Sequence, residues 1–447
     1  MIRGAGAALA LALLSAGLLP TPAAAQVAPP AGRASAPPFQ PPAVPRAQPA
    51  PPRAFPVPVQ AARGVPPPRY LIEVLTFGPG DHPFTRFGHD AIRVVDRLAQ
   101  TDVVYNFGTF SITPGLISDF LRGRLRYWLS VSSTGPALEE YRLENRSIEA
   151  QGLALSADGA AELVRRLQEN ALPQNRAYKY DYFRDNCATR VRDALDAVTG
   201  GAVRTAAAAT ASQTLRGQAL RMAADDLPFY LALSIVLGPV TDRPIDAWSE
   251  DFLPQMLQRT LRLTRLSDPP ARGLVANERV VFAAHRPLPR PAPPRWAGRF
   301  LAAGVAVGLV FFLLGVLARR LVLARVLLGA LLAITGGALG FLGSFLLGAW
   351  LFTPHAVVYR NQNILLCAPF ALTLLVLGWG VAFGWAGAIR KAFFVVAAGL
   401  GLAVLALLIK PLAAPQDNGA LIAFALPLWL GLTGALAKLR TRAAPST

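Results

Sequence analysis

The most informative stretch of the soluble part of this chain is Tyr182-Phe-Arg-Asp-Asn-Cys-Ala-Thr-Arg-Val-Arg192. It places a cysteine where a helix is predicted to begin, and the rest of the domain is interpreted around it. Asn186 or Cys187 starts this predicted helix, and Gly200-Gly201 gives it a C-terminal glycine signal. The unpaired N–H groups and the positive dipole end of a helix stabilise a thiolate, the nucleophilic form of cysteine. We therefore predict Cys187 as a nucleophile, and the alternative is an inert buried thiol.

A nucleophilic cysteine needs a base, and histidine is the usual choice. The soluble part contains His82, His89 and His285. His89 follows a glycine into a predicted strand, which would hold its ring on a rigid sheet, whereas the other two lie in a loop and near a linker. Asn106, on the next strand, is predicted to orient the imidazole as a third catalytic residue. The alternatives are a structural histidine and an asparagine that satisfies a strand end.

The elements around these residues predict an α+β domain over residues 70–290, long enough at about 220 residues for a hydrophobic core. Short runs rich in β-branched and aromatic residues favour strands, and Ser156 is a good N-cap for a helix that continues to about Asn170. A helix is expected at 114–121, and further helices are expected at 205–266. The expected strands cover 70–77, 88–95, 102–107, 125–131, 147–155 and 279–282.

Two segments precede this domain. Residues 1–25 combine a basic start, an apolar run and Ala23-Ala24-Ala25, which is typical of a secretory signal peptide, with an uncleaved anchor helix as the alternative. Residues 26–69 are rich in proline and alanine and predict an extended, disordered tether. The domain is therefore expected outside the cytoplasm.

The last third of the chain predicts an all-α bundle of five transmembrane helices over 296–437, because apolar runs of about 20 residues recur there. Only Arg360 and Lys410 lie on one side of these runs, and the remaining basic residues indicate that the other side faces the cytoplasm. Residues 438–447 would then form a cytoplasmic tail. The predicted spans are 296–317, 325–352, 364–388, 392–409 and 421–437. The basic residues of the cytoplasmic side are Arg319, Arg320, Arg325, Arg390, Lys391, Lys438, Arg440 and Arg442.

The composition of the chain limits which binding partners and cofactors are expected. The formal net charge of +18 comes mainly from arginine and suits an anionic bilayer surface. Nucleic acid is not expected, since export and membrane spans argue against it and no basic helix is interleaved with aromatic residues. The two cysteines make no disulfide framework. No metal-ligand spacing or Gly-rich phosphate loop is present, so neither a metal nor another cofactor is expected.

One polar segment interrupts the bundle, Thr353-Pro-His-Ala-Val-Val-Tyr-Arg-Asn-Gln-Asn363, on the side of the soluble domain. His355, Arg360 and Asn363 in this loop are predicted to bind substrate, for example a phosphate headgroup. The alternative is a solvated connection between two spans.

Three short motifs together carry a resemblance to a known family: Phe87-Gly88-His89, Tyr105-Asn106-Phe107-Gly108 and Asn186-Cys187. They resemble the Lnb N-terminal periplasmic domain, a relative of the circularly permuted NlpC/P60 or papain-like hydrolases, in which the histidine strand precedes the cysteine helix. The resemblance covers residues 70–198, and the membrane part is similar in architecture only. It implies a permuted papain-like, NlpC/P60-type periplasmic domain in the bacterial inner membrane.

The resemblance also implies a reaction. Lnb-type enzymes are bacterial lipoprotein N-acyltransferases, which move an acyl chain from a phospholipid to the N-terminus of a lipoprotein. By this resemblance Cys187 would be acylated after His89 removes its proton. Two other functions stay open: a papain-like cell-wall amidase or endopeptidase, which would not need the spans, and a non-catalytic binding module on a membrane scaffold.

Overall fold

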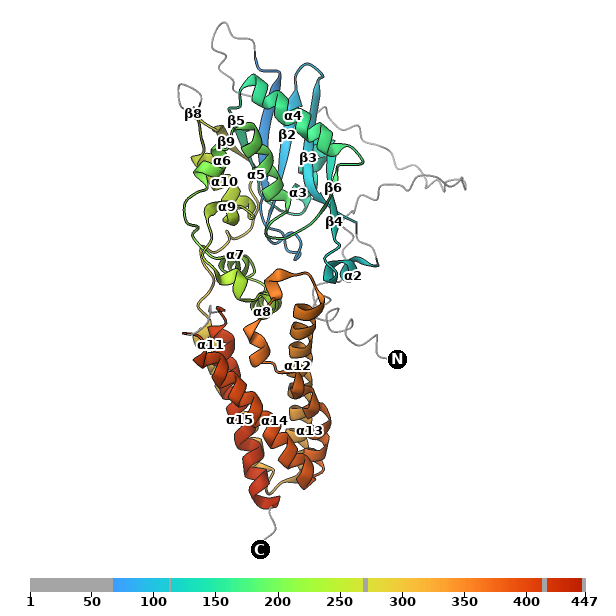
Figure 1. Cartoon of the computed structure of the whole chain (residues 1–447), viewed down its shortest axis with the longest axis vertical. Coiled ribbons are helices and arrows are strands. Elements are labelled where there is room, and N and C mark those ends of the chain that lie inside the picture. Colours follow the sequence, from blue (N-terminus) through green and yellow to red (C-terminus); the bar gives the residue numbers. More distant parts are fainter. Residues whose placement is uncertain (1–66, 112–113, 268–271, 412–415, 444–447) are drawn as a thin grey trace, which may run out of the picture.

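The computed structural model describes residues 67–111, 114–267, 272–411 and 416–443. The predicted signal peptide, nearly all of the tether and the end of the cytoplasmic tail lie outside these residues. The described chain forms a mixed α/β sheet domain followed by a helical bundle, stacked along the long axis of the molecule (Figure 1).

A seven-stranded antiparallel sheet forms the centre of the domain, in the order β6-β4-β3-β2-β1-β5-β9. The predicted strands are all present, and the last is longer than expected because Val275 already pairs with Leu153. β1 and β2 pair along their whole length, so that Phe77 lies opposite His89 at one end of the sheet. The strands are β1 Tyr70–Phe77, β2 His89–Asp96, β3 Thr101–Thr109, β4 Arg126–Ser133, β5 Ile148–Leu153, β6 Ala177–Lys179 and β9 Val275–Phe282.

Helices cover both faces of this sheet. One face packs against α4 (Ala157–Ala171), α5 (Cys187–Val198) and α10 (Pro254–Leu263) around a core that includes Val74, Ile92 and Leu195. The other face packs against α3 (Thr134–Leu143). Side chains of a strand alternate between the faces, so Asp90 and Ala91 contribute to different sides.

Short elements connect the sheet to the bundle. Among them, α8 is strongly apolar and lies at the junction of the two parts in Figure 1. A small hairpin of β7 and β8 sits apart from the main sheet. These connecting elements are α2 Leu116–Leu121, α6 Ala202–Ala206, α7 Leu215–Met222, α8 Leu227–Val236, η1 Pro239–Asp242, α9 Ala247–Glu250, β7 Arg265–Leu266 and β8 Arg272–Gly273.

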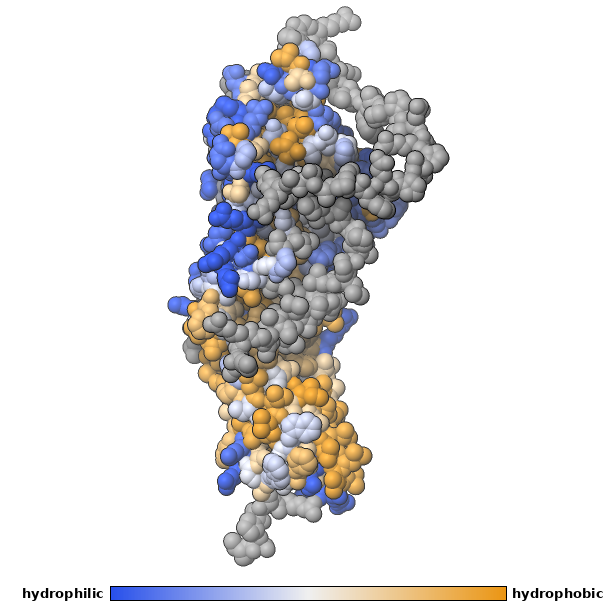
Figure 2. Space-filling view, turned by 90° about the vertical axis from the view of Figure 1, so that its right-hand side faces the viewer, coloured by the Kyte–Doolittle hydropathy of each residue, from blue (hydrophilic) through white to orange (hydrophobic). Residues whose placement is uncertain are grey.

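Five helical segments in the bundle are long and apolar enough to cross a membrane, which makes the chain a multi-pass membrane protein. In Figure 2 hydrophobic residues cover most of the visible bundle, while hydrophilic residues gather on the sheet domain. Glycines allow close packing here: a Cβ on Gly304 or Gly308 of α11 would meet the backbone of α15. The elements are α11 Ala297–Leu317, α12 Val322–Phe352, η2 Ala356–Val358, η3 Gln362–Leu365, η4 Pro369–Thr373, α13 Leu374–Ala382, α14 Ala386–Leu408 and α15 Gly419–Ala443.

The third span differs from its prediction. It is built from η3, η4 and α13 and ends at Ala382, not at Ala388. Gly384 adopts a φ of +80°, so the turn falls there and α14 begins at Ala386. Arg390 and Lys391 therefore lie within α14 and not in the connection before it. Apolar residues on both sides of the turn hide this boundary from a hydropathy pattern.

Candidate active site

Cys187 is the first residue of α5, and the residue before it fixes its position. Oδ1 of Asn186 accepts from the Thr189 N–H at 3.0 Å, and Oγ1 of Thr189 accepts from the Asn186 N–H at 2.8 Å, which forms a capping box. The Asn186 amide also donates to the carbonyls of Tyr182 and Phe252. Asn186 is buried and Cys187 half-buried, so the thiol sits on a rigid support at the predicted helix start.

His89 is the first residue of β2, and its ring is held on the next strand by Asn106. Nε2 of His89 lies 2.6 Å from Oδ1 of Asn106. An amide oxygen only accepts, so Nε2 carries the proton and Nδ1 is left as the basic nitrogen. Aromatic rings of Phe77 and Tyr141 stack against the imidazole, with centroids 6.0 Å and 6.1 Å away. The structure thus brings together the two residues predicted as base and orienting group.

Gly108 connects this pair with the cysteine. A Cβ at this position would lie 3.2 Å from Cε1 of His89 and 3.7 Å from Cβ of Cys187, so both side chains approach the same point. Gly108 has a φ of +110°, and the pairing of β3 with β4 is irregular here, between Phe107 and Thr109. Both the backbone conformation and the space therefore require glycine. Cys187, His89 and Asn106 form one cluster around it.

Burial controls the charge states of this cluster. Burial raises the pKa of the Cys187 thiol, against the opposing effect of backbone N–H groups of Asp90, Ala188 and Cys187 itself and of the Arg146 charge. Burial, aided by Arg146, lowers the pKa of His89 to about 4, although the hydrogen bond to Asn106 acts in the other direction. At neutral pH the resting pair is a thiol beside a neutral imidazole. Nδ1 of His89 is thus unprotonated at neutral pH.

Two ionisable residues next to the cluster were not predicted from the sequence. Asp90 is fully buried and accepts from the Thr76 hydroxyl at 2.8 Å; burial, with the nearby Cys187, raises its pKa well above the usual range. Arg146 is 3% exposed, donates to the carbonyl of Gly78 and pairs with Glu144. Its guanidinium carbon lies 4.7 Å from the centre of the Tyr141 ring. Arg146 thus places a positive charge against the Tyr141 ring, which stacks on His89. Its neighbours in the sequence give no signal of this position.

The predicted substrate-binding loop contacts the sheet domain through His355. Nε2 of His355 donates to the carbonyl of Phe120 at 2.6 Å, which leaves Nδ1 to accept from the Tyr182 hydroxyl at 3.2 Å. Tyr182 lies in the same short segment as Cys187, ahead of the cysteine helix. His355 therefore links the bundle to the segment that leads into the Cys187 helix.

The other two residues of that loop differ from each other. The Asn363 amide donates to the carbonyls of Ser234 and Ile235 and accepts from Asn418, so it fastens the last turn of α8 to the bundle. Arg360 is exposed, has a φ of +55° and makes no hydrogen bond or ion pair within the described ranges. Its guanidinium is the one of the three predicted groups left open to an anion.

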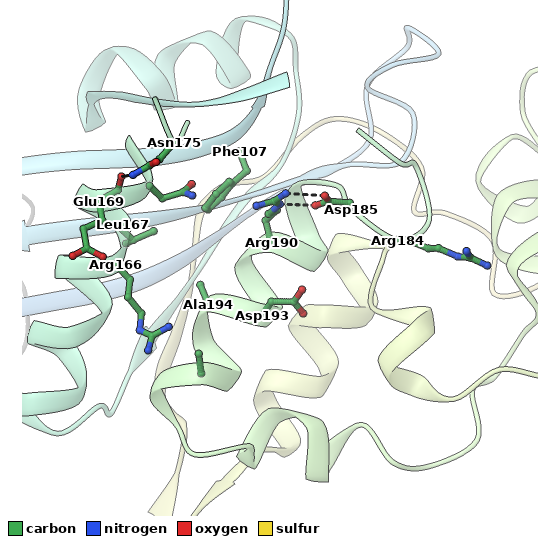
Figure 3. Close-up of a pocket in the computed structure, with 12 residues that line it drawn as sticks. Phe107, Arg166, Leu167, Glu169, Asn175, Arg184, Asp185, Arg190, Asp193 and Ala194 are labelled. Carbon is green, nitrogen blue, oxygen red and sulfur yellow. Dashed lines mark hydrogen bonds and ion pairs between the residues drawn. The ribbon is translucent and has the colours of Figure 1, made fainter. Parts of the chain in front are cut away.

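A polar cleft of about 610 Å³ lies between α4 and α5 beside Phe107. Figure 3 shows Arg190 of α5 paired with Asp185 at this cleft, with Nε and Oδ1 2.5 Å apart. Its lining includes Arg184 and Asp185, which immediately precede the cysteine helix, but neither Cys187 nor His89. Among the described residues no group of three His, Cys, Asp or Glu side chains could hold a metal ion.

Comparison with protein families finds one match. Residues 61–217 match the Lnb N-terminal periplasmic domain, which confirms the resemblance drawn from the sequence motifs. The matched stretch contains Cys187, His89 and Asn106. Comparisons with curated proteins and with solved structures find no match. The chain is thus a membrane protein with a domain of the periplasmic Lnb type.

Proposed function

We propose, from the premise that residues 61–217 are an Lnb N-terminal periplasmic domain, that this protein is a thiol acyltransferase of bacterial lipoproteins. It would move an acyl chain from a phospholipid to the N-terminal amine of a lipoprotein through an acyl-Cys187 intermediate. The observation that carries the proposal is the cluster around Gly108, where the Nε2 hydrogen bond to Asn106 leaves Nδ1 of His89 as the base beside Cys187.

In the first half-reaction Nδ1 of His89 takes the proton of the Cys187 thiol as the sulfur attacks the ester carbonyl carbon of a phospholipid. The new C–S bond makes a tetrahedral oxyanion, and backbone N–H groups at the start of α5 are suited to stabilise it, at about 3 kcal/mol per donor. Collapse breaks the C–O bond, and the leaving alkoxide of the lysophospholipid takes the proton from His89. The product is a thioester on Cys187.

In the second half-reaction the amine of the lipoprotein attacks the thioester carbon, and His89 accepts a proton from the amine. Collapse forms the amide and releases Cys187 as a thiolate, which regains a proton from His89. The low pKa of His89 favours its return to the neutral base after each half-reaction. Each half-reaction forms one bond to the acyl carbon and breaks one, and His89 returns each proton that it takes. The ping-pong cycle therefore needs no oxidant or added cofactor.

Two features of the whole chain support this assignment. The histidine strand β2 precedes the cysteine helix α5 in the sequence, which supports a permuted papain-like arrangement of the domain. The five spans and the His355 to Tyr182 contact keep the thiol close to a bilayer, where the acyl donor resides. The distribution of basic residues favours the bacterial inner membrane with the domain in the periplasm.

The test is to trap the thioester. Purified full-length protein incubated with a phospholipid radiolabelled in its acyl chain should acquire hydroxylamine-sensitive label, which peptide mapping locates at Cys187. Cys187→Ala should acquire none, and Cys367→Ala, the matched control for the second cysteine, should still acquire label at Cys187. Acyl transfer to a lipopeptide by Cys187→Ser at the wild-type rate would rule out the proposed intermediate.

A cell-wall peptidase is the second candidate, favoured by the cleft of Figure 3, which carries charges of both signs and adjoins the start of the Cys187 helix without being lined by Cys187 itself. Peptidoglycan peptides carry both amines and carboxylates, which such a cleft suits. Incubation with purified cell-wall material separates the two functions. Release of peptide fragments that Cys187→Ala abolishes, without thioester formation from phospholipid, would replace the acyltransferase by this peptidase.

A further inference from the structure

An apolar cavity of about 470 Å³ lies at the end of the bundle that faces the sheet domain. Its walls come from α8, α11, α12, η3 and α15, and α8 is the wall nearest the sheet domain in Figure 1. Lining residues from α8 are Leu227, Leu231 and Ile235. The cavity therefore lies where the membrane-spanning helices meet the domain that carries Cys187.

The lining of this cavity includes one charged residue, Arg299, in the first turns of α11. Arg299 is exposed and makes no ion pair or hydrogen bond within the part of the chain that the structure describes. Asn363, the polar residue of the lining, already bonds to the end of α8 and to Asn418. The cavity thus offers an apolar interior and one available cation.

This combination fits a phospholipid better than a protein segment. A polypeptide backbone in an apolar cavity would leave its N–H and C=O groups without partners, whereas an acyl chain has none to satisfy. An arginine at the level of the headgroups pairs well with a phosphate oxygen. Trp296, which also lines the cavity, is a residue type enriched at that level.

Helix α8, one wall of the cavity, contacts the segment that leads into the catalytic cluster. Asp226 caps α8 and pairs with Arg86 at 3.0 Å, and the ring of Phe229 lies 6.1 Å from that of Phe87. Arg86 and Phe87 belong to the segment that leads directly into His89. One helix therefore contacts both the cavity and the chain that holds the base.

We propose that this cavity binds an acyl chain of a phospholipid whose phosphate pairs with Arg299. The inference rests on the proposed function, because it names where the acyl donor is held before its ester reaches Cys187. Binding itself requires no chemistry at the thiol, so the two can be tested separately.

The experiment uses full-length Cys187→Ala protein in nanodiscs that contain a phosphatidylethanolamine with a diazirine on its acyl chain. After irradiation, mass spectrometry should place the crosslinks on the lining segments of α8, α11 and α15. Ala425→Trp and Leu231→Trp, which fill the cavity from two different helices, should each reduce these crosslinks at least about fivefold. Leu313→Trp, on an exposed part of α11 outside the cavity, should leave them unchanged.

The charge is tested in the same nanodiscs. Arg299→Glu should weaken labelling of the cavity about fivefold, the effect of about one basic residue at an anionic surface. Arg295→Glu is the matched control, since this exposed arginine lies one turn earlier outside the lining. Equal effects of the two variants would show a general surface attraction and would overturn the assignment of Arg299.

The outcomes separate the two proposals. The labelling could instead be spread evenly over the outer faces of the bundle and stay unchanged in both filling variants. That result would overturn the proposal that the cavity binds lipid. If a diacylated lipopeptide displaces the probe more strongly than unlabelled phospholipid does, the cavity binds the acyl acceptor. That result would overturn the proposal that it binds the donor. Cavity labelling without any thioester on Cys187 in the unmutated protein would retain the lipid site and reject the acyltransferase.

Discussion

At the scale of single residues, Gly108, which lies between His89 and Cys187, is the most constrained position of the candidate site. We predict that Gly108→Ala abolishes most thioester formation, because its new methyl group would lie 3.2 Å from the His89 ring. Gly200→Ala is the matched control: its φ is +62°, yet a Cβ there meets nothing within 4 Å. Both variants should lose about 1 kcal/mol of unfolding free energy, measured by denaturant titration. Equal activity of the two would show that Gly108 is needed only for its backbone.

Arg146 is predicted to act through its charge on the resting thiol. A cation favours the thiolate and so lowers the pKa of Cys187. Arg146→Met should therefore raise that pKa, so that alkylation of Cys187 by iodoacetamide requires higher pH. Arg146→Lys should restore the profile in part, and Arg142→Met, on the surface of α3, should not move it. A profile that stays unchanged in Arg146→Met would leave this residue with a packing role only.

At this scale the sequence could indicate the chemistry but not all of its neighbours. Cys187, His89 and Asn106 were predicted because their residue types and their places at element ends carry a local signal. Asp90 and Arg146 carry none, since their effect on the site depends on burial and on which strands meet. The positive φ of Gly108 likewise depends on the irregular pairing of β3 with β4.

At the scale of elements, the capping box of α5 links the stability of the helix to the position of Cys187. Asn186→Ala removes the acceptor of the Thr189 N–H and the donor to two buried carbonyls, and should cost roughly 1–2 kcal/mol of unfolding free energy. It should also slow thioester formation, because Cys187 is the next residue. Ser156→Ala removes the cap of α4 and should cost about 1 kcal/mol with normal thioester formation. If Asn186→Ala and Ser156→Ala lose activity equally, the loss comes from reduced global stability and not from the position of Cys187.

The pattern of elements was largely readable from the sequence, and the exceptions have local causes. Ser156 caps α4 and Asn186 caps α5 as the cap signals predict. α3 was missed because it begins Thr134-Gly-Pro, residues that favour a turn, although proline is tolerated in a first helical turn. The interrupted third span was missed because hydropathy does not distinguish 3₁₀ turns from a continuous helix within an apolar run.

At the scale of the whole molecule, the proposed function requires that a periplasmic thiol reach a lipid in the bilayer. The sequence supplied the division into a sheet domain and a bundle, because the composition changes abruptly between them. It could not supply their contact, which depends on side chains far apart in the chain. That contact includes His355 of the bundle, which bonds to Phe120 and to Tyr182 just before the cysteine helix.

We predict that His355→Ala separates access to lipid from reactivity of the thiol. Loss of two hydrogen bonds, each worth about 1 kcal/mol, should loosen the domain on the bundle and reduce thioester formation from phospholipid by up to about thirtyfold. Alkylation of Cys187 by iodoacetamide, which arrives from water, should stay at its normal rate. His285→Ala is the control, since its ring is exposed and its backbone alone bonds to Asn145. If both reactions of the thiol slow together in His355→Ala, the contact supports the fold of the site; if neither changes, the loop is only a connection between spans.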